Sequence, residues 1–184
     1  MSDADVDLVQ RAQRGDRQAF VSLYDKHYMS VFNFVYYRVM DEPLAQDITA
    51  EVFVRLVRDI RKLKSHEKAL LGWLYRVARN LIIDHYRRTK RIVDEPEGEA
   101  HLIVPDNLPQ LIDLAISSLQ LQEAFLTLTD EQQQVILLKF VEGYSNREIG
   151  ERLDKSEGAI KSLQHRALDG LRRVLVKEYG YEAN

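Results

Sequence analysis

The sequence has 184 residues, of which 45% are hydrophobic, and a formal net charge of −3, so it has enough apolar material for one ordinary domain or two small ones. It contains no cysteine, which excludes a disulfide scaffold, a thiolate zinc site and a cysteine nucleophile. No run approaches the roughly 18 consecutive apolar residues of a membrane span, and the acidic N-terminus is unlike a signal peptide. We therefore expect a cytoplasmic protein without membrane insertion.

The charge is distributed unevenly along the chain. Between Arg55 and Arg91, twelve basic residues stand against three acidic ones. The acidic residues are concentrated elsewhere, at the N-terminus, within 94–99 and through the last third of the sequence. A local positive field of this kind attracts phosphate groups even though the whole protein is slightly acidic.

Four helical segments are predicted in the N-terminal half, because apolar residues recur there at spacings of three and four. The third segment begins after Asp41, a suitable cap that is followed by Pro43 in the first turn, and the fourth runs from about Leu70 to Arg88. The apolar positions of the first three segments are Leu8, Val9 and Ala12; Phe20, Leu23, Tyr24, Val31 and Val35; and Ile48, Val52, Leu56 and Ile60.

A linker is predicted between the two halves, because three of the four prolines and a run of acids fall between residues 94 and 109. We expect an all-α fold of two small helical domains, 1–92 and 117–184, joined by a flexible linker at 93–116. Capping-box spacing at Thr129 and Ser145 predicts helix starts near Asp130 and Asn146. A further helix begins at Ser156 and ends near residue 176, which gives a helix-turn-helix pattern.

The fourth segment has two opposed faces when it is projected at 100° per residue. One side carries the packing residues Leu74, Val77, Ala78, Leu81 and His85. The opposite side carries Arg76, Arg79, Asn80, Ile83 and Arg87. A solvated charged face is the simpler interpretation, but balancing acids are scarce and the basic residues continue past the helix end, which favours a surface that binds phosphates.

The last helix also has two faces. Its packing side holds Ile160, Ala167, Leu171, Val174 and Leu175, and Lys161, Ser162, His165 and Arg166 point away as candidate groove readers. From residue 122 to 176 eight basic residues nearly balance nine acidic ones, so this half alone should bind DNA weakly.

The segment 73–88, Trp-Leu-Tyr-Arg-Val-Ala-Arg-Asn-Leu-Ile-Ile-Asp-His-Tyr-Arg-Arg, resembles region 2.4 of the extracytoplasmic-function sigma factors, which recognises the promoter minus-10 element. The segment 47–55, Asp-Ile-Thr-Ala-Glu-Val-Phe-Val-Arg, resembles region 2.2, which docks on the polymerase β′ clamp. The resemblance implies a polymerase-binding role for Asp47, Glu51, Phe53 and Arg55, and a place for Asn80 near the captured minus-10 base. Core packing is the alternative role for Phe53.

Between these two segments lies the basic stretch 62–69, whose equivalent in the family receives a flipped base of the non-template strand. Its candidate DNA-binding residues are Lys62, Lys64, His66 and Lys68. Unstacking a base costs about a few kcal/mol, so a pocket shaped for the base, with cations on the flanking phosphates, converts binding energy into strand separation. The stretch lacks the aromatic residue of many relatives.

The segment 156–167, Ser-Glu-Gly-Ala-Ile-Lys-Ser-Leu-Gln-His-Arg-Ala, resembles sigma region 4.2, which reads the minus-35 element in the major groove. The resemblance also implies that Lys139 touches a phosphate. Leu163 stands where arginine is common, so a change to arginine is expected to strengthen DNA binding. Gln164 stands where an apolar residue is common and is expected to pack in part.

The resemblance implies a sigma region 2 bundle and a sigma region 4 helix-turn-helix domain. It also implies binding to core RNA polymerase, at the β′ clamp and the β flap, to promoter DNA, and to an anti-sigma factor, with no cofactor, metal or catalytic residue. A conventional helix-turn-helix regulator is the main alternative, and it would share only the C-terminal pattern. An enzyme acting on nucleic acid is disfavoured by scattered histidines and the lack of a phosphate loop, and a purely inactive decoy by the intact basic faces.

Overall fold

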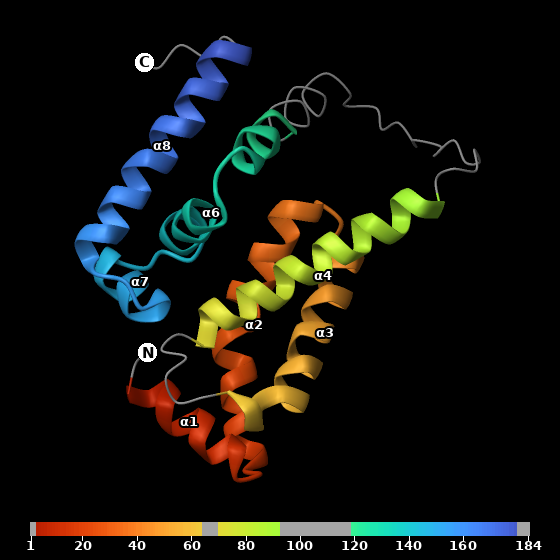
Figure 1. Cartoon of the computed structure of the whole chain (residues 1–184). Coiled ribbons are helices and arrows are strands. Elements are labelled where there is room, and N and C mark those ends of the chain that lie inside the picture. The colour runs from red at the N-terminus through yellow and green to blue at the C-terminus, as the bar shows by residue number, and fades with distance from the viewer. Residues whose placement is uncertain (1–2, 64–69, 93–118, 180–184) are drawn as a thin grey trace, which may run out of the picture.

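The computed structural model describes residues 3–63, 70–92 and 119–179, and every regular element within these ranges is a helix (Figure 1). The all-α expectation is therefore confirmed. The elements of the N-terminal half are α1 (Asp3–Gln13), α2 (Arg17–Val39), α3 (Glu42–Asp59), the short 3₁₀ helix η1 (Ile60–Lys62) and α4 (Leu70–Ile92). Helix α2 packs against α1, α3 and α4, and α4 also packs against α3.

Side-chain caps fix where the helices of this half begin. The Asp16 carboxylate accepts hydrogen bonds from the backbone N–H of Gln18 at 2.9 Å and of Ala19 at 3.3 Å, and so starts α2. Asp41 accepts from the N–H of Leu44 at 2.9 Å, which confirms the predicted cap of α3. Between them, Met40 ends α2 in the left-handed conformation, with φ of 51°.

A buried ionic contact attaches α1 to α2. The Asp5 carboxylate lies 2.7 Å from Lys26 Nζ and 3.3 Å from His27 Nε2, and both Asp5 and His27 are buried. Burial alone would raise the pKa of Asp5, but the contacts with His27 and Lys26 outweigh it and hold this pKa well below its usual range. The carboxylate is therefore ionised when the helix is docked.

Aromatic side chains form a row along α2. Neighbouring ring centroids lie 5.1 Å apart for Tyr24 and Tyr28, 6.1 Å for Tyr28 and Phe32, and 5.8 Å for Phe32 and Tyr36. The four residues are spaced by one helical turn, which places them on one side of α2. Phe53 of α3 contacts this row, with its ring 4.8 Å from that of Tyr24.

The C-terminal half contains a helical segment at 119–126, α6 (Asp130–Ile136), the π-helical turn η2 (Leu137–Val141), α7 (Asn146–Leu153) and α8 (Glu157–Tyr179). Both predicted capping boxes are present, so the helix starts at Asp130 and Asn146 are confirmed. Ser156 caps α8 through a 3.2 Å hydrogen bond from the N–H of Ala159.

A close backbone approach shapes the turn between α7 and α8. Asp154 adopts the left-handed conformation, with φ of 53°, and Lys155 donates its N–H to the carbonyl of Gly150 at 2.9 Å. A Cβ placed on Gly150 would lie 2.5 Å from the carbonyl oxygen of Lys155. Only glycine fits at this position without moving the turn.

The two halves pack directly against each other. Helix α7 contacts α4, η2 contacts α2, and one buried apolar cluster contains residues of both halves. In Figure 1, α6 and α7 lie beside the bundle of α2 and α4. The prediction of two separate helical units did not include this contact, because no local sequence pattern reports on packing between segments so far apart.

Replacing Gly150 with alanine should lower the free energy of unfolding by about 1 to 3 kcal/mol, because the new methyl group overlaps a backbone carbonyl. Chemical denaturation followed by circular dichroism measures this loss. Gly158→Ala is the matched control, since nothing lies within 4 Å of the added Cβ and alanine favours a helix. Equal stability of the two variants would contradict the tight turn.

Candidate nucleic-acid interface

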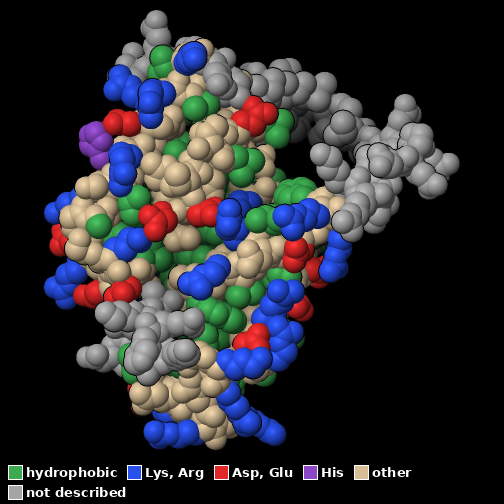
Figure 2. Space-filling model, in the orientation of Figure 1, with side chains coloured by type: hydrophobic (Ala, Val, Ile, Leu, Met, Phe, Trp, Pro, Cys, Tyr) green, Lys and Arg blue, Asp and Glu red, His purple; other side chains and the backbone are tan. Residues whose placement is uncertain are grey.

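Helix α4 presents the two faces that its sequence predicts. Leu74 and Ala78 are buried, whereas Arg76, Asn80 and Arg87 are exposed. Figure 2 shows lysine and arginine side chains along α4 on the face toward the viewer. Ile83, predicted on the open face, is only half-buried. The exposed side therefore has the composition of a phosphate-binding surface with apolar material among the cations.

The buried side of α4 is wider than predicted. Leu71, Tyr75 and Ile82 are buried as well, and the Tyr75 ring stacks on that of Phe34 with centroids 4.4 Å apart. The predicted packing residues Val77, Leu81 and His85 are half-buried. The difference arises because α4 is covered by α2 and α3 on one side and by α7 on another. Burial raises the pKa of the Tyr75 hydroxyl well above its usual value.

Arg79 differs from the other exposed arginines of α4, because it is engaged by the C-terminal half. Its Nε lies 2.6 Å from an oxygen of Asp130, the first residue of α6. The second oxygen of the same carboxylate accepts a hydrogen bond from Arg38 at 3.2 Å. Arg79 was predicted to face DNA, and in this conformation it faces a carboxylate.

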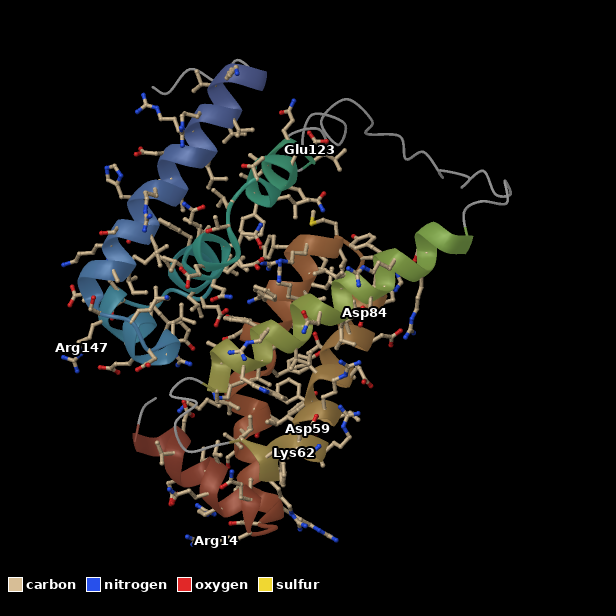
Figure 3. All side chains as sticks on the ribbon, viewed as in Figure 1. Arg14, Asp59, Lys62, Asp84, Glu123 and Arg147 are labelled. Carbon is tan, nitrogen blue, oxygen red and sulfur yellow. The ribbon has the colours of Figure 1, made fainter. Side chains whose placement is uncertain are left out.

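The basic stretch after α3 is described only at its beginning. Lys62 is exposed and lies 3.1 Å from Asp59, which also pairs with Arg58 at 3.0 Å (Figure 3). Lys64, His66 and Lys68 lie outside the described residues.

Three of the four predicted polymerase-binding residues lie together. Asp47, Glu51 and Arg55 line a hollow between α3 and α4, and Arg55 donates to Glu51 at 2.9 Å. The α4 wall of the hollow adds Leu81, Asp84, His85 and Arg88, which the sequence reasoning did not assign to it. Phe53 is only 7% exposed and lies within the packed core, as its alternative role requires.

The candidate readers on α8 are all exposed. Lys161 pairs with Glu157 at 2.8 Å and His165 with Asp169 at 3.0 Å. The hydroxyl of Ser162 donates to the carbonyl of residue 158 at 3.0 Å, and Arg166 donates to the carbonyl of residue 162 at 3.2 Å. The donor groups of these side chains have local partners, but the side chains stay exposed to solvent. DNA groups can therefore replace the local partners. Lys139, on η2, is half-buried.

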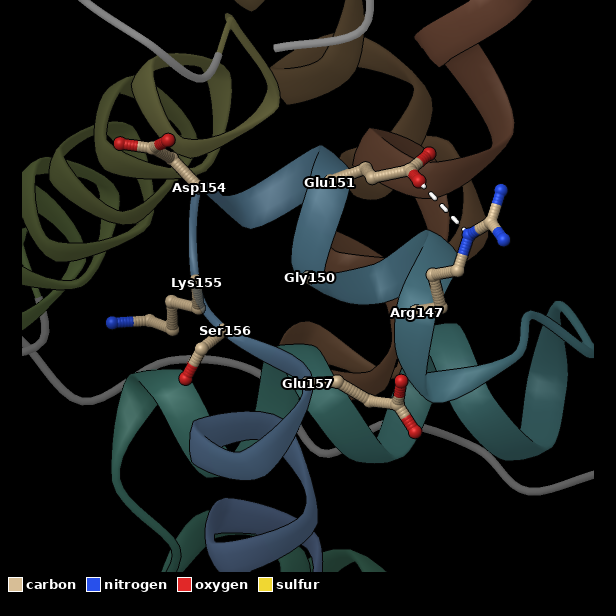
Figure 4. Close-up of a pocket in the computed structure, with 7 residues that line it drawn as sticks. All are labelled: Arg147, Gly150, Glu151, Asp154, Lys155, Ser156 and Glu157. Atoms are coloured by element: carbon tan, nitrogen blue, oxygen red, sulfur yellow. Dashed lines mark hydrogen bonds and ion pairs between the residues drawn. The ribbon is translucent and has the colours of Figure 1, made fainter.

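A shallow pocket lies at the helix-turn-helix turn (Figure 4). Arg147 of α7 lies at its edge and donates to Glu151 at 3.2 Å, and Ser156 and Glu157 at the start of α8 form the other side. Arg147 was not among the predicted readers. The sequence signal for Arg147 is its place in the first helix of the helix-turn-helix motif, because that helix crosses the DNA backbone.

Residues 23–92 match the Sigma-70 region 2 family, and residues 124–173 match Sigma-70, region 4. The ECF RNA polymerase sigma factor SigW of Bacillus subtilis is 32% identical over 178 residues, which cover 91% of this chain and 94% of SigW. This chain belongs to the extracytoplasmic-function sigma factors. BldN of Streptomyces coelicolor, a sigma factor of the same type, is 34% identical over 92% of this chain and 65% of BldN.

The fold is shared with a solved structure. CnrH, in a complex with the cytosolic domain of CnrY, has a TM-score of 0.59 and 22% identity over 95% of this sigma factor and 99% of CnrH. The match to region 2 favours the sigma-factor assignment over a conventional regulator, which would share only the helix-turn-helix half. Within the described residues, no helix is both long and apolar enough to cross a membrane, and no group of three potential ligands could hold a metal ion.

The structure overturns the expectation for Leu163. This side chain is 6% exposed and belongs to the buried cluster with Ile160 and Ala167. The spacing of three and four residues between these positions places Leu163 on the packing side of α8. An arginine at position 163 would point into the core rather than toward a phosphate. Gln164 is half-buried, as expected.

Replacing Leu163 with arginine should therefore destabilise this sigma factor by about 3 kcal/mol or more, because an unpaired charge would be buried. Leu168→Arg is the control on the same helix, where the side chain is 42% exposed, and should change stability by less than about 0.5 kcal/mol. Thermal and denaturant unfolding of both variants measure the difference. Full stability of Leu163→Arg together with tighter DNA binding would restore the original expectation.

Proposed function

We propose that this sigma factor binds core RNA polymerase, directs it to promoters and helps to open the DNA. The observation that carries the proposal is the arrangement of α4, whose cationic side is exposed while its apolar side is fixed in the bundle. The hollow lined by Asp47, Glu51 and Arg55 is the surface we assign to the β′ clamp. The C-terminal half would meet the β flap.

Opening would use the exposed side of α4 and the stretch 62–69. Cations such as Arg76 and Arg87 would hold phosphates, and Asn80 would act on the extruded minus-10 base together with His66. Capture of a flipped base supplies the free energy that strand separation needs, which is about a few kcal/mol for each unstacked base. No nucleotide hydrolysis is required for that step.

Minus-35 recognition is assigned to the exposed side of α8, with Lys161, Ser162, His165 and Arg166 in the major groove and Lys139 on a phosphate. The reading surface is small, and acidic residues accompany its cations. The isolated chain should therefore bind promoter duplex weakly and gain specificity only within the holoenzyme.

We further propose a regulatory partner and a location. Family membership supports an anti-sigma factor that covers the polymerase-binding and DNA-binding faces, and action on core polymerase and promoter DNA places the protein in the cytoplasm. The proposed division is a region 2 domain at 1–92, a linker at 93–116 and a region 4 domain at 117–184. The first and the last of these segments contain the two family matches. The proposal assigns no catalytic residue to the chain.

Reconstitution with core polymerase tests the assignment of α8. The double variant Lys161→Ala and Arg166→Ala should form holoenzyme normally and lose minus-35 discrimination, by about 1 to 3 kcal/mol for each bidentate base contact removed. Binding to core polymerase and run-off transcription on templates with intact or scrambled minus-35 elements measure the two properties. A holoenzyme that fails to assemble would show that this face contacts polymerase instead.

Promoter binding and promoter opening should be separable by substitutions in the N-terminal half. A variant with Asn80→Ala and His66→Ala should form closed complexes almost normally but open duplex promoters poorly, because these residues are proposed to act on the extruded base. A pre-melted bubble template should restore transcription. Permanganate reactivity of unpaired thymines, measured beside run-off transcription, distinguishes the steps. Equal transcription from the duplex and bubble templates would show that neither residue acts in promoter opening.

A further inference from the structure

A side-chain amide of α1 holds the backbone at the end of η1. Gln13 is the last residue of α1, and its Nε2 group donates hydrogen bonds to the carbonyl of Ile60 at 3.0 Å and to the carbonyl of Leu63 at 2.8 Å. Both bonds are partly buried. A carbonyl oxygen can only accept, so both hydrogens of the amide nitrogen are used and the orientation of the amide is fixed.

The two carbonyls lie where the chain leaves η1. Leu63 follows this short helix in an extended conformation, with φ of −64° and ψ of 113°, and its N–H donates to the Ile60 carbonyl at 3.2 Å. The last carbonyls of a helix have no partner within the helix and need donors from elsewhere. Gln13 supplies such a donor on each side of Lys62, the first residue of the basic stretch 62–69.

Helix α1 is docked by contacts that do not involve Gln13. At one end is the buried ionic contact of Asp5 with α2, and Val9 and Ala12 are buried farther along the helix. Arg11 pairs at 2.8 Å with Asp16, the residue that caps α2. Helix α1 is therefore a fixed support that packs on α2 and contacts η1 (Figure 1). Removing the Gln13 amide should release η1 without undocking α1.

We propose that Gln13 is a positioning residue for promoter opening, which acts on the backbone at Ile60 and Leu63 rather than on DNA. It sets the place and direction from which the chain continues into the stretch 62–69. This inference rests on the proposed function, because it takes that stretch as the one that binds the extruded base. Groups that capture a base must be held in their bound geometry, so a support one step removed from the DNA affects strand separation.

Gln13→Met is the test variant, because it removes both donors and keeps an unbranched side chain that favours a helix. Gln10→Met is the matched control, since Gln10 lies on the same helix and is exposed to solvent. Both variants are made in the whole chain and are compared as the free protein and as the holoenzyme.

Hydrogen exchange of the free chain, followed by NMR, tests the anchor itself. The N–H of Leu63 should exchange about tenfold faster in Gln13→Met, because the turn that it closes loses its support, whereas the amides of Val9 and Ala12 should exchange at wild-type rates. The control should match wild type throughout. Unchanged exchange at Leu63 would overturn the anchor. Equally faster exchange throughout α1 would show that Gln13 only helps to dock this helix, which would also overturn the proposal.

Promoter opening by reconstituted holoenzyme tests the role. Gln13→Met should bind core polymerase and form closed complexes as wild type and Gln10→Met do, but it should open duplex promoters about tenfold more slowly, and a pre-melted bubble template should restore transcription. The time course of permanganate reactivity measures opening, and gel-shift titration measures closed complexes. A parallel loss of closed complexes, or no rescue by the bubble, would overturn a role in positioning.

Failure of the two proposals can be told apart. If wild-type holoenzyme did not open promoters, the proposed function would fall and the role of Gln13 with it. Normal opening by wild type and by Gln13→Met alike would overturn the role of Gln13 alone.

Discussion

Helix α4 must bury one side and keep the other in water, and the arrangement of the whole molecule follows from this constraint. Leu71, Leu74 and Ala78 are buried, and α4 packs against α2, α3 and α7, which fixes the rotation of the helix about its own axis. Full burial of a leucine side chain contributes about 1.5 to 3 kcal/mol, so turning the helix to hide its arginines would be strongly unfavourable. The exposed cations are therefore held in position by packing on the opposite side.

The C-terminal half depends on local backbone chemistry to a greater extent. Two capping boxes set the starts of α6 and α7, and a left-handed Asp154 with the close approach at Gly150 sets the angle at which α8 leaves the turn. Because these devices act within a few residues, the direction of α8 is fixed close to its exposed readers. Precise presentation of a recognition helix requires this local rigidity.

Features that depend on neighbours in sequence were predicted well, and features that depend on distant segments were not. The caps at Thr129 and Ser145 were predicted because both partners lie within one helical turn. Arg38 and Asp130 are 92 positions apart, and neither residue has a pattern that points to the other. Leu163 was misplaced for a different reason: arginine is common at this place in the family, but the residue lies three and four positions from the buried Ile160 and Ala167. That spacing already placed it in the core.

The buried apolar cluster runs from α1 to α8 without a boundary between the halves. A molecule with two independent cores would melt in two steps, whereas shared packing makes the free energy of one half depend on the other. The free chain should therefore behave as a single cooperative unit in calorimetry. A ligand that holds the halves apart would divide that unit, so that a substitution in α8 would no longer affect the melting of α2.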